Sequence, residues 1–394
     1  MGYYAEYIDK KLNFEQLSKH RKEQLKKISE LRGRNVLVFA ADLNKAQAPI
    51  SIGFEDVTPL NDQIHNLGQG DLDLIIETPG GAGEIAESIV RSLREQFDSL
   101  SIIIPGSSMS AGTIVAMSAD EILMHRHQSS LGPIDAQLLQ NGKQFSAHAF
   151  LEGIEKIKAE AKQDGLNPAY GPILQFISPG EIEHARNAQK FSRSLVADCL
   201  VKYKFRHWET HSNTGEPVTK KDKADRAQQI ADALCDHGHW KTHGRRIRLS
   251  DLERLGLTIT DYSQSMPELC EAIERYYTLL HMMFSQSEFY KIYETTTSQI
   301  LKGQRVIQPK LSPQQQAQPA TPGTQSKVAD LDIDCTCGTK SKIQANLGVA
   351  QPLAKGKFAY PPNDEFKCPG CGKQYNLAKA RAQAEEQSGE KVIP

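Results

Sequence analysis

Short apolar stretches alternate with longer stretches of helical periodicity between residues 34 and 135. The apolar stretches lie at residues 36–40, 72–76, 101–104 and 121–124. Between two of them, Ile85, Ile89, Leu93 and Phe97 recur every fourth residue, as on one face of a helix. Because these strand-sized stretches are apolar throughout, the alternation predicts an α/β fold in which helices cover both faces of a parallel sheet.

The rest of the chain divides by composition. Residues 1–33 form a charged helical arm with Leu17, Leu25, Ile28 and Leu31 roughly on one stripe. We expect the main domain to extend over 34–302, and a Gln-, Pro-, Thr- and Ser-rich linker over 303–330, since that segment has too few apolar side chains to offset its ordering entropy. Residues 331–394 form a cysteine-bearing tail.

Beyond residue 135 the pattern becomes helical. Ser178-Pro-Gly-Glu181 is a capping box with proline at the first helical position, which predicts a helix that continues to about residue 204. Further helices are expected at 147–162 and near 224–235, 250–255 and 267–293. These helices should form the outer layer and supply subunit contacts.

The net charge and the distribution of cysteines indicate the partners and the location to expect for this protein. The 394 residues carry a formal net charge of −1, so neither nucleic acid nor an anionic membrane is expected as an obligatory partner. The first residues lack the apolar core of a signal peptide, and no apolar run is long enough to span a bilayer. Cys199, Cys235 and Cys270 are scattered singly, as in a reducing compartment, which predicts a cytoplasmic protein.

Two turns at the ends of predicted strands carry the chemistry. The first is Glu77-Thr-Pro-Gly-Gly-Ala-Gly83, whose adjacent glycines allow unusual backbone angles and whose N–H groups, next to a helix start, suit an anion. It matches neither the G-x-G-x-x-G dinucleotide motif nor the P-loop. By itself, such a turn is also compatible with a purely structural role.

The second turn is Pro105-Gly-Ser-Ser-Met-Ser110-Ala-Gly-Thr113, which also connects a strand to a helix. Ser110 lies at the helix start, where the helix dipole favours negative charge, and the small residues after it leave room for a substrate carbonyl. The alternative is that Ser107 or Ser108 caps the helix.

Together the two turns resemble those of the Clp-type and signal-peptide-peptidase-A-type serine proteases. In these families a Pro-Gly-Gly turn is followed roughly thirty residues later by a Ser-Ala-Gly or Ser-Met-Gly turn, as Thr78-Pro-Gly-Gly81 and Ser110-Ala-Gly112 are here. With Leu131-Gly-Pro-Ile-Asp-Ala-Gln137, residues 35–262 are most similar to the serine dehydrogenase proteinase family. The resemblance implies a Clp/crotonase fold of ββα repeats with Ser110 as nucleophile, and the N–H groups of Gly81 and Ala111 as oxyanion hole.

The general base is less clearly indicated. At the position where Clp proteases carry their histidine, this chain has Asp135. The family's third catalytic position precedes a segment like 245–257, where His239 and His243 lie. The resemblance therefore implies that His243 or His239 is the base and that Asp135 orients it, with the two family positions exchanged.

Other groups remain candidates for the base. Signal-peptide-peptidase-A-type enzymes use a lysine forty to fifty residues beyond the serine, an interval that here holds Lys156, Lys158 and Lys162. His148 opens the same predicted helix. Asp135 could instead cap a turn, and the His-x-His-x₃-His cluster ending at His243 could bind a metal.

Four cysteines in the tail predict a metal site. Cys335-Thr-Cys337 and Cys368-Pro-Gly-Cys371 have the form of a zinc ribbon, although the first pair is C-x-C rather than C-x-x-C. Four thiolates would leave Zn²⁺ no open coordination position, so the ion is expected to be structural, and the tail to dock a protein partner. The alternatives are a disulfide or free thiols.

These expectations define a serine endopeptidase that acts on protein or peptide substrates and, by resemblance, forms a homo-oligomer. One rival is a crotonase-type acyl-CoA enzyme, which shares the fold but does not use a serine nucleophile. An α/β-hydrolase is another, although its G-x-S-x-G motif would require glycine at Ser108. A non-catalytic Clp-like scaffold that displays its zinc ribbon is the third.

Overall fold

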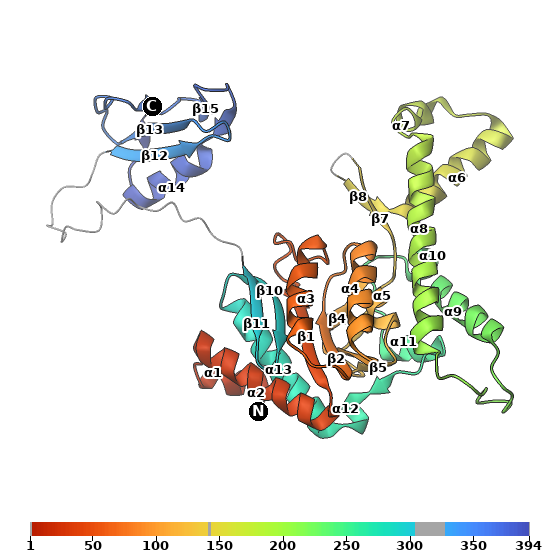
Figure 1. The fold of residues 1–394 in the computed structure, drawn as a ribbon. Coiled ribbons are helices and arrows are strands. Elements are labelled where there is room, and N and C mark those ends of the chain that lie inside the picture. Colours follow the sequence, from red (N-terminus) through yellow and green to blue (C-terminus); the bar gives the residue numbers. More distant parts are fainter. Residues whose placement is uncertain (1, 141–142, 304–327, 394) are drawn as a thin grey trace. The chain divides into compact units, whose positions relative to one another are not determined.

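The chain folds into two units, Met1–Val306 and Ile307–Pro394 (Figure 1). The structure is a computed structural model that describes residues 2–140, 143–303 and 328–393. The predicted linker at 303–330 lies almost entirely outside these residues, and it stays a prediction.

A seven-stranded sheet is the centre of the first unit, in the order β11-β10-β1-β2-β3-β5-β9. Neighbouring strands from β1 to β9 are parallel, whereas β10 is antiparallel to both β1 and β11. The strands are β1 (Asn35–Ala41), β2 (Asp71–Glu77), β3 (Ser99–Ile104), β5 (Glu121–Met124), β9 (Thr260–Asp261), β10 (Phe289–Thr295) and β11 (Gln299–Gly303). The predicted α/β class with a parallel sheet is confirmed.

Buried side chains on both faces explain why the parallel strands are apolar throughout. In β2, Leu74 and Ile76 lie in one hydrophobic core, and Ile75 lies in the other. The first core is completed by α3 (Val57–His65), α4 (Gly83–Gln96), α5 (Ala111–Met117) and α8 (Pro179–Cys199). The second is completed by α2 (Phe14–Arg32) and α13 (Pro267–Ser285), which pack against each other (Figure 1).

Two sequence predictions about this second face were wrong. The helix expected at 267–293 ends at Ser285, and residues 289–295 form strand β10. In β10, Ile292 and Tyr293 face opposite cores, which is the period of a strand. In the N-terminal arm, Leu17, Leu25 and Ile28 are buried as expected, whereas Leu31 is 42% exposed and does not belong to the buried stripe.

The remaining elements of the first unit are mostly helical. The capping box at Ser178 forms as predicted, and α8 continues into a π-helical turn at Leu200–Lys204. The other helices are α1 (Tyr3–Asp9), α6 (Ala147–Asp164), α7 (Gly171–Leu174), α9 (Lys220–Leu234), α10 (His237–Trp240), α11 (Leu249–Arg254) and α12 (Tyr262–Ser265), with 3₁₀ turns at Phe54–Asp56 and Pro168–Tyr170. Short strands are β4 (Ser107–Ser108), β6 (Ser130–Leu131), β7 (Gln137–Gln140) and β8 (Lys143–Ser146).

The second unit has a small core around a hairpin. Strands β12 (Val328–Asp334) and β13 (Lys340–Leu347) are antiparallel, and β14 (Phe358–Ala359) and β17 (Val392–Ile393) add to β13. A separate hairpin joins β15 (Glu365–Lys367) to β16 (Gln374–Asn376), followed by α14 (Ala378–Ser388). Its buried apolar residues are Ile343, Ala345, Leu347, Tyr360, Phe366, Leu377 and Val392. A core this small benefits from an additional cross-link.

Candidate active site

The Pro-Gly-Gly turn begins directly after β2. Gly80 and Gly81 have φ values of +100° and +152°, angles that favour glycine. A Cβ atom on Gly80 would lie 2.7 Å from Ser110 Cβ, and one on Gly81 would lie 2.2 Å from the carbonyl oxygen of Ile52. Only glycine therefore fits at either position, and the tertiary structure brings Gly80 against Ser110.

Ser110 lies at the start of α5, after β3 and the short strand β4. Its φ and ψ are +50° and −112°, a backbone conformation that non-glycine residues rarely adopt and that clusters at functional sites. Its side chain makes no capping hydrogen bond to the helix. Neither Ser107 nor Ser108 occupies the cap position, and across the described residues the Ser110 hydroxyl has no hydrogen-bond partner.

The backbone around these two turns exposes two N–H groups. The carbonyl of Gly80 accepts a hydrogen bond from the N–H of Ile52 at 2.6 Å, and the carbonyl of Ser110 accepts one from Thr113 at 2.8 Å. Because a trans peptide directs its C=O and N–H to opposite sides, the N–H groups of Gly81 and Ala111 point away from those partners. Neither donates to any acceptor in the part of the chain that the structure describes.

Hydrogen bonds hold the two turns together. The N–H of Thr78 donates to the carbonyl of Ser107 at 3.0 Å, and the N–H of Met109 donates back to the carbonyl of Thr78 at 2.9 Å. Ala111 N would lie 3.3 Å from a Cβ atom on Gly80. The predicted nucleophile and the two predicted oxyanion donors are thus gathered around one glycine.

Asp135 is buried in a polar cluster. Ser146 Oγ donates to its Oδ1 at 2.8 Å, and Gln137 Nε2 donates to its Oδ2 at 2.8 Å. The same Oδ2 lies 3.1 Å from His237 Nδ1 and 4.0 Å from His243 Nδ1. Burial lowers the pKa of His243, although the charge of Asp135 opposes that shift. His243 is therefore kept neutral over a wider pH range than an exposed histidine, as a general base requires.

The structure separates the candidate bases. His239, which the sequence could not distinguish from its neighbours, is exposed and packs its ring against Trp240 at 4.6 Å. His237, which the sequence did not single out, contacts Asp135 instead. A signal for it was present, since Asp236 caps α10 and His237 and His239 lie two positions apart on that helix, where side chains do not share a face.

The lysines of α6 lie on its exposed surface. Lys156 Nζ is 2.9 Å from Glu152, and Lys158 Nζ is 2.8 Å from Glu155. His148 lies near the Asp135 cluster, with its ring centroid 5.5 Å from that of His237. These exposed, ion-paired lysines fit a catalytic role less well than the histidines beside the buried Asp135.

No titratable side chain of the described residues lies within hydrogen-bond distance of Ser110 Oγ. The Asp135 cluster is nevertheless close along the chain. A Cβ atom on Gly132 would lie 3.1 Å from Met109 Cα, and Asp135 follows three residues later. Three residues of extended chain span at most about 11 Å, so the backbone of Asp135 lies within that distance of Gly132, which packs against the residue before Ser110.

A clamp formed by Glu77, Tyr277 and His281 holds the end of β2. The buried carboxylate of Glu77 accepts hydrogen bonds from Tyr277 Oη at 2.6 Å and His281 Nε2 at 3.1 Å, both from α13. Burial lowers the pKa of His281 and the bond to Glu77 raises it, with a net increase. Since Thr78 is the next residue, this clamp fixes the start of the Pro-Gly-Gly turn.

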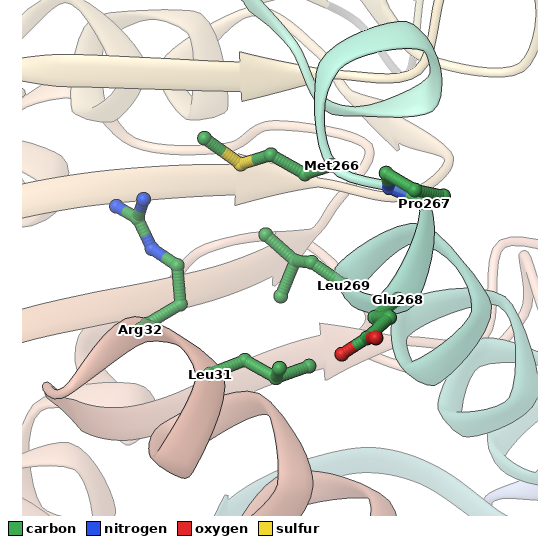
Figure 2. Close-up of a pocket in the computed structure, with 6 residues that line it drawn as sticks. All are labelled: Leu31, Arg32, Met266, Pro267, Glu268 and Leu269. Carbon is green, nitrogen blue, oxygen red and sulfur yellow. The ribbon is translucent and has the colours of Figure 1, made fainter.

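A pocket of about 390 Å³ lies elsewhere (Figure 2). It is lined by Leu31 and Arg32 at the end of α2 and by residues 266–269 at the start of α13. Arg32 bonds to Asp73 and to Glu121, the first residue of β5. The pocket is therefore at the amino ends of the strands, opposite the edge where Ser110 lies.

His125, Cys270 and Glu274 also lie close enough to share a metal ion. However, His125 Nδ1 accepts hydrogen bonds from the N–H groups of His127 and Gln128, at 3.1 and 3.2 Å. That arrangement puts the ring proton on Nε2, the atom that would have to bind the metal toward Glu274. The donor set does not fit a metal ion at this place.

The four cysteines of the second unit come together as predicted. Cys335 and Cys337 follow β12, and Cys368 and Cys371 lie between β15 and β16. The sulfur atoms of Cys335 and Cys371 are 3.5 Å apart, and those of Cys337 and Cys368 are 3.7 Å apart. These distances exceed a disulfide bond and match the roughly 3.8 Å edge of a tetrahedron with 2.3 Å metal–sulfur bonds. The cluster can bind a metal ion.

One family model matches the first part of the chain. Residues 4–167 match the family described as ClpP-like SDH-type serine proteinase. This region contains Gly81, Ser110 and Asp135 but ends before His237 and His243. The resemblance to ClpP-like serine proteinases that the two turns indicated is therefore confirmed for residues 4–167.

The curated relatives are themselves uncharacterized. Two proteins of Methanocaldococcus jannaschii are 30% identical over 201 residues and 29% identical over 197 residues. The matches cover 51% and 50% of this chain, and 56% and 55% of the relatives, so the chain spans little more than half the length of either.

Similarity to solved structures is weak. The ClpP protease catalytic domain from Plasmodium falciparum has a TM-score of 0.20 and 15% identity, covering 27% of this chain and 57% of its own. ClpP1 from Listeria monocytogenes has a TM-score of 0.31 and 11% identity, covering 59% and 92%. In the described parts of the chain, no helix combines the length and apolar character needed to cross a bilayer.

Proposed function

We propose that the chain is a serine peptidase that hydrolyses peptide bonds through an acyl-enzyme on Ser110. One observation carries the proposal: Gly80 holds a strained, unbonded Ser110 beside the N–H groups of Gly81 and Ala111, which have no acceptor among the described residues. Two such donors suit the oxyanion of a tetrahedral intermediate. The serine also argues for a peptidase over a crotonase-type acyl-CoA enzyme.

The chemistry follows the serine peptidase pattern. Ser110 Oγ attacks the carbonyl carbon of the scissile bond while its proton passes to the base, and the carbonyl oxygen becomes an oxyanion held by Gly81 and Ala111. When the intermediate collapses, the C–N bond breaks and the base returns the proton to the leaving amine. Water then attacks the acyl-enzyme by the same route and releases the acid, which regenerates the serine.

His243 is proposed as the base, oriented by Asp135. Its lowered pKa and its position beside a buried carboxylate support this assignment. His237 is the alternative that the structure adds, because its Nδ1 is the closer of the two to Asp135. Asp135 itself, held by Ser146 and Gln137, has the fixed orientation that the third member of a triad needs.

A fluorophosphonate probe tests the nucleophile. We expect it to label the wild type at Ser110 and to leave Ser110→Ala unlabelled. Ser88→Ala is a matched control, since Ser88 is an exposed serine on α4 whose hydroxyl bonds only to its own helix. Cleavage of an unstructured protein such as casein should show the same pattern. Failure of the folded wild type to label would leave the scaffold alternative standing.

For the second unit we propose a structural Zn²⁺ bound by Cys335, Cys337, Cys368 and Cys371. Four thiolates in a closed tetrahedron are the ligand set that zinc prefers, and the small core gives the ion a stabilising role. We expect about one zinc per chain by elemental analysis and none in a Cys368→Ser, Cys371→Ser variant. An equivalent zinc content in that variant would contradict the assignment. Docking of a protein partner by this unit remains a prediction.

The remaining proposals concern the setting of the enzyme. We expect a cytoplasmic homo-oligomer that acts on protein or peptide substrates. All seven cysteines are unpaired, as in a reducing compartment. Sedimentation of the purified chain tests the oligomeric state, and a monomer at micromolar concentration would contradict it.

A further inference from the structure

Lys291 is a fully buried cation on β10, close to the Pro-Gly-Gly turn. Its Nζ donates to Asp56 Oδ1 at 2.8 Å and Oδ2 at 2.9 Å, and to the carbonyl oxygen of Ser51 at 2.7 Å. Glu55 lies 3.4 Å away at the exposed side. Both Lys291 and Asp56 have completely buried side chains, and each is the nearest opposite charge to the other.

Asp56 is also held by neutral donors. Its carboxylate accepts hydrogen bonds from the N–H of Gly53 at 2.8 Å and from the hydroxyl of Tyr293. Segment 51–56 is thereby fastened to β10 at both ends, by Ser51 and by Asp56. Between these two points lies Ile52, the residue that contacts the Pro-Gly-Gly turn.

Two peptide groups connect Lys291 to the proposed oxyanion donor. In the first, between Ser51 and Ile52, the carbonyl accepts from Lys291 and the N–H donates to the carbonyl of Gly80 at 2.6 Å. The second peptide group lies between Gly80 and Gly81. Because its carbonyl faces Ile52, its N–H, which belongs to Gly81, points away from Ile52. The N–H of Ala82 donates back to the carbonyl of Ile52 at 3.0 Å, which locks the alignment.

We propose that Lys291 and Asp56 are positioning residues that aim the Gly81 N–H at the oxyanion of the substrate. This inference rests on the proposed peptidase function. The ammonium fixes the Ser51 carbonyl, and each peptide plane then sets the direction of the next bond. A charge at the head of a hydrogen-bonded chain also polarises it, which makes the last N–H a stronger donor.

A second buried ion pair on the same strand provides a matched control. Arg21 and Glu294 have completely buried side chains 3.2 Å apart, like Lys291 and Asp56. Arg21 comes from α2 and bonds to Glu294 and Gln299. The hydrogen bonds of Ile52 within the described residues go to Gly80 and Ala82 instead. Replacing either cation with methionine removes the nearest cation from a buried carboxylate and leaves a second lysine near it, Lys22 at 3.3 Å from Glu294 and Lys302 at 4.0 Å from Asp56. Only the replacement of Lys291 is expected to affect the turn.

The test compares Lys291→Met with Arg21→Met by two measurements. The first is amide hydrogen exchange at Ile52 and Ala82, and the second is the rate of fluorophosphonate labelling of Ser110 per folded molecule. In Lys291→Met we expect both amides to lose protection. Labelling should slow by about tenfold to 10²-fold, which is less than the 10²- to 10³-fold cost of losing one oxyanion donor, because the Gly81 N–H is misaligned and not removed. In Arg21→Met both should stay within about threefold of the wild type, because its pair does not touch the turn.

If Lys291→Met does not fold, the double variant Lys291→Met, Asp56→Asn replaces it, since it leaves no unpaired charge buried and still lacks the ammonium. Unchanged exchange at Ile52 and Ala82 would overturn the inference, and so would loosened amides with unchanged labelling. If the wild type itself does not label, the proposed peptidase function is wrong, and the exchange rates alone decide whether Lys291 holds the turn.

Discussion

The two sides of the candidate site are built from different chemical groups: mainly backbone N–H groups on one side, and ionisable side chains on the other. On the nucleophile side, the groups are backbone atoms of Gly81 and Ala111 and one short side chain, Ser110, all fixed by turn geometry. On the base side, the groups are the long side chains of Asp135, His237 and His243, which come from segments a hundred residues apart.

The two sides therefore differ in how firmly hydrogen bonds hold them. Four backbone hydrogen bonds, from Ile52, Thr78, Met109 and Thr113, determine the nucleophile side almost completely. The base side has two histidines competing for one carboxylate oxygen, and neither is hydrogen-bonded to Ser110. We infer that the nucleophile side is rigid before substrate arrives and that the base side adjusts when it binds, as catalytic hydrogen bonds often do.

The largest effect should follow from replacing Gly80 with alanine, which adds one methyl group next to Ser110. In Gly80→Ala the new Cβ would lie 2.7 Å from Ser110 Cβ at a φ of +100°, so the turn must move and the Gly81 N–H with it. We expect fluorophosphonate labelling to fall by about 10³-fold.

Gly153→Ala is the matched control for this substitution. Gly153 lies within α6, and a Cβ there would meet nothing within 4 Å. We expect this variant to label at the wild-type rate. Equal labelling of the two alanine variants would show that the contact between Gly80 and Ser110 has no part in catalysis.

The next largest effect should follow from replacing the histidine that acts as the base. In His243→Gln we expect peptide cleavage to fall by about 10²-fold, the usual contribution of a general base, and in His237→Gln by less than tenfold. Steady-state kinetics with a fluorogenic peptide measures both. The reverse ranking would assign the base to His237, and two small effects would exclude both from proton transfer.

The pH profile sharpens the same comparison. A base must be neutral to act, and burial lowers the pKa of His243 below its ordinary value near 6.5. Activity should therefore persist as the pH falls below 6.5, and the acid limb of kcat/KM should lie lower than for an exposed histidine. Asp135 opposes the shift, so Asp135→Asn should move the limb to still lower pH while reducing the plateau by about tenfold. An acid limb at or above 6.5 would argue against His243.

The smallest effect should come from the clamp of Glu77, Tyr277 and His281, which holds the start of the Pro-Gly-Gly turn. The pKa of His281 is raised in the folded chain, so its ion pair with Glu77 stabilises the fold fully below the unfolded pKa. That contribution is lost as the pH rises through the folded pKa. Asp42 and Tyr277 face His281 as well.

Urea unfolding measures this contribution. We expect wild type to exceed His281→Gln in free energy of unfolding by about 1 kcal/mol at pH 5.5 and by less at pH 9. A difference that grows with pH would contradict the assigned direction of the pKa shift.

Much of the fold followed from local patterns, and its departures have clear physical causes. The four parallel strands were predictable because each carries its apolar signal within a few residues. Strand β10 was mistaken for the end of a helix, since its partner β1 lies about 250 residues earlier and no local feature announces that pairing. Strand β9 also pairs with a distant strand, β5, whereas β11 joins the sheet through its hairpin with β10.

The candidate site divides in the same way. Glycine turns and a serine at a helix start are recognisable from the sequence alone, because backbone conformation is set by neighbouring residues. The two turns and the four cysteines of the second unit could therefore be singled out in advance. Ser110, Gly81 and Ala111 became candidates within those turns only through the resemblance to a protease family. The choice between His237 and His239, and the connection from Lys291 through Ile52 to Gly81, depend on which side chains long-range packing brings together. Only the tertiary structure decides such contacts.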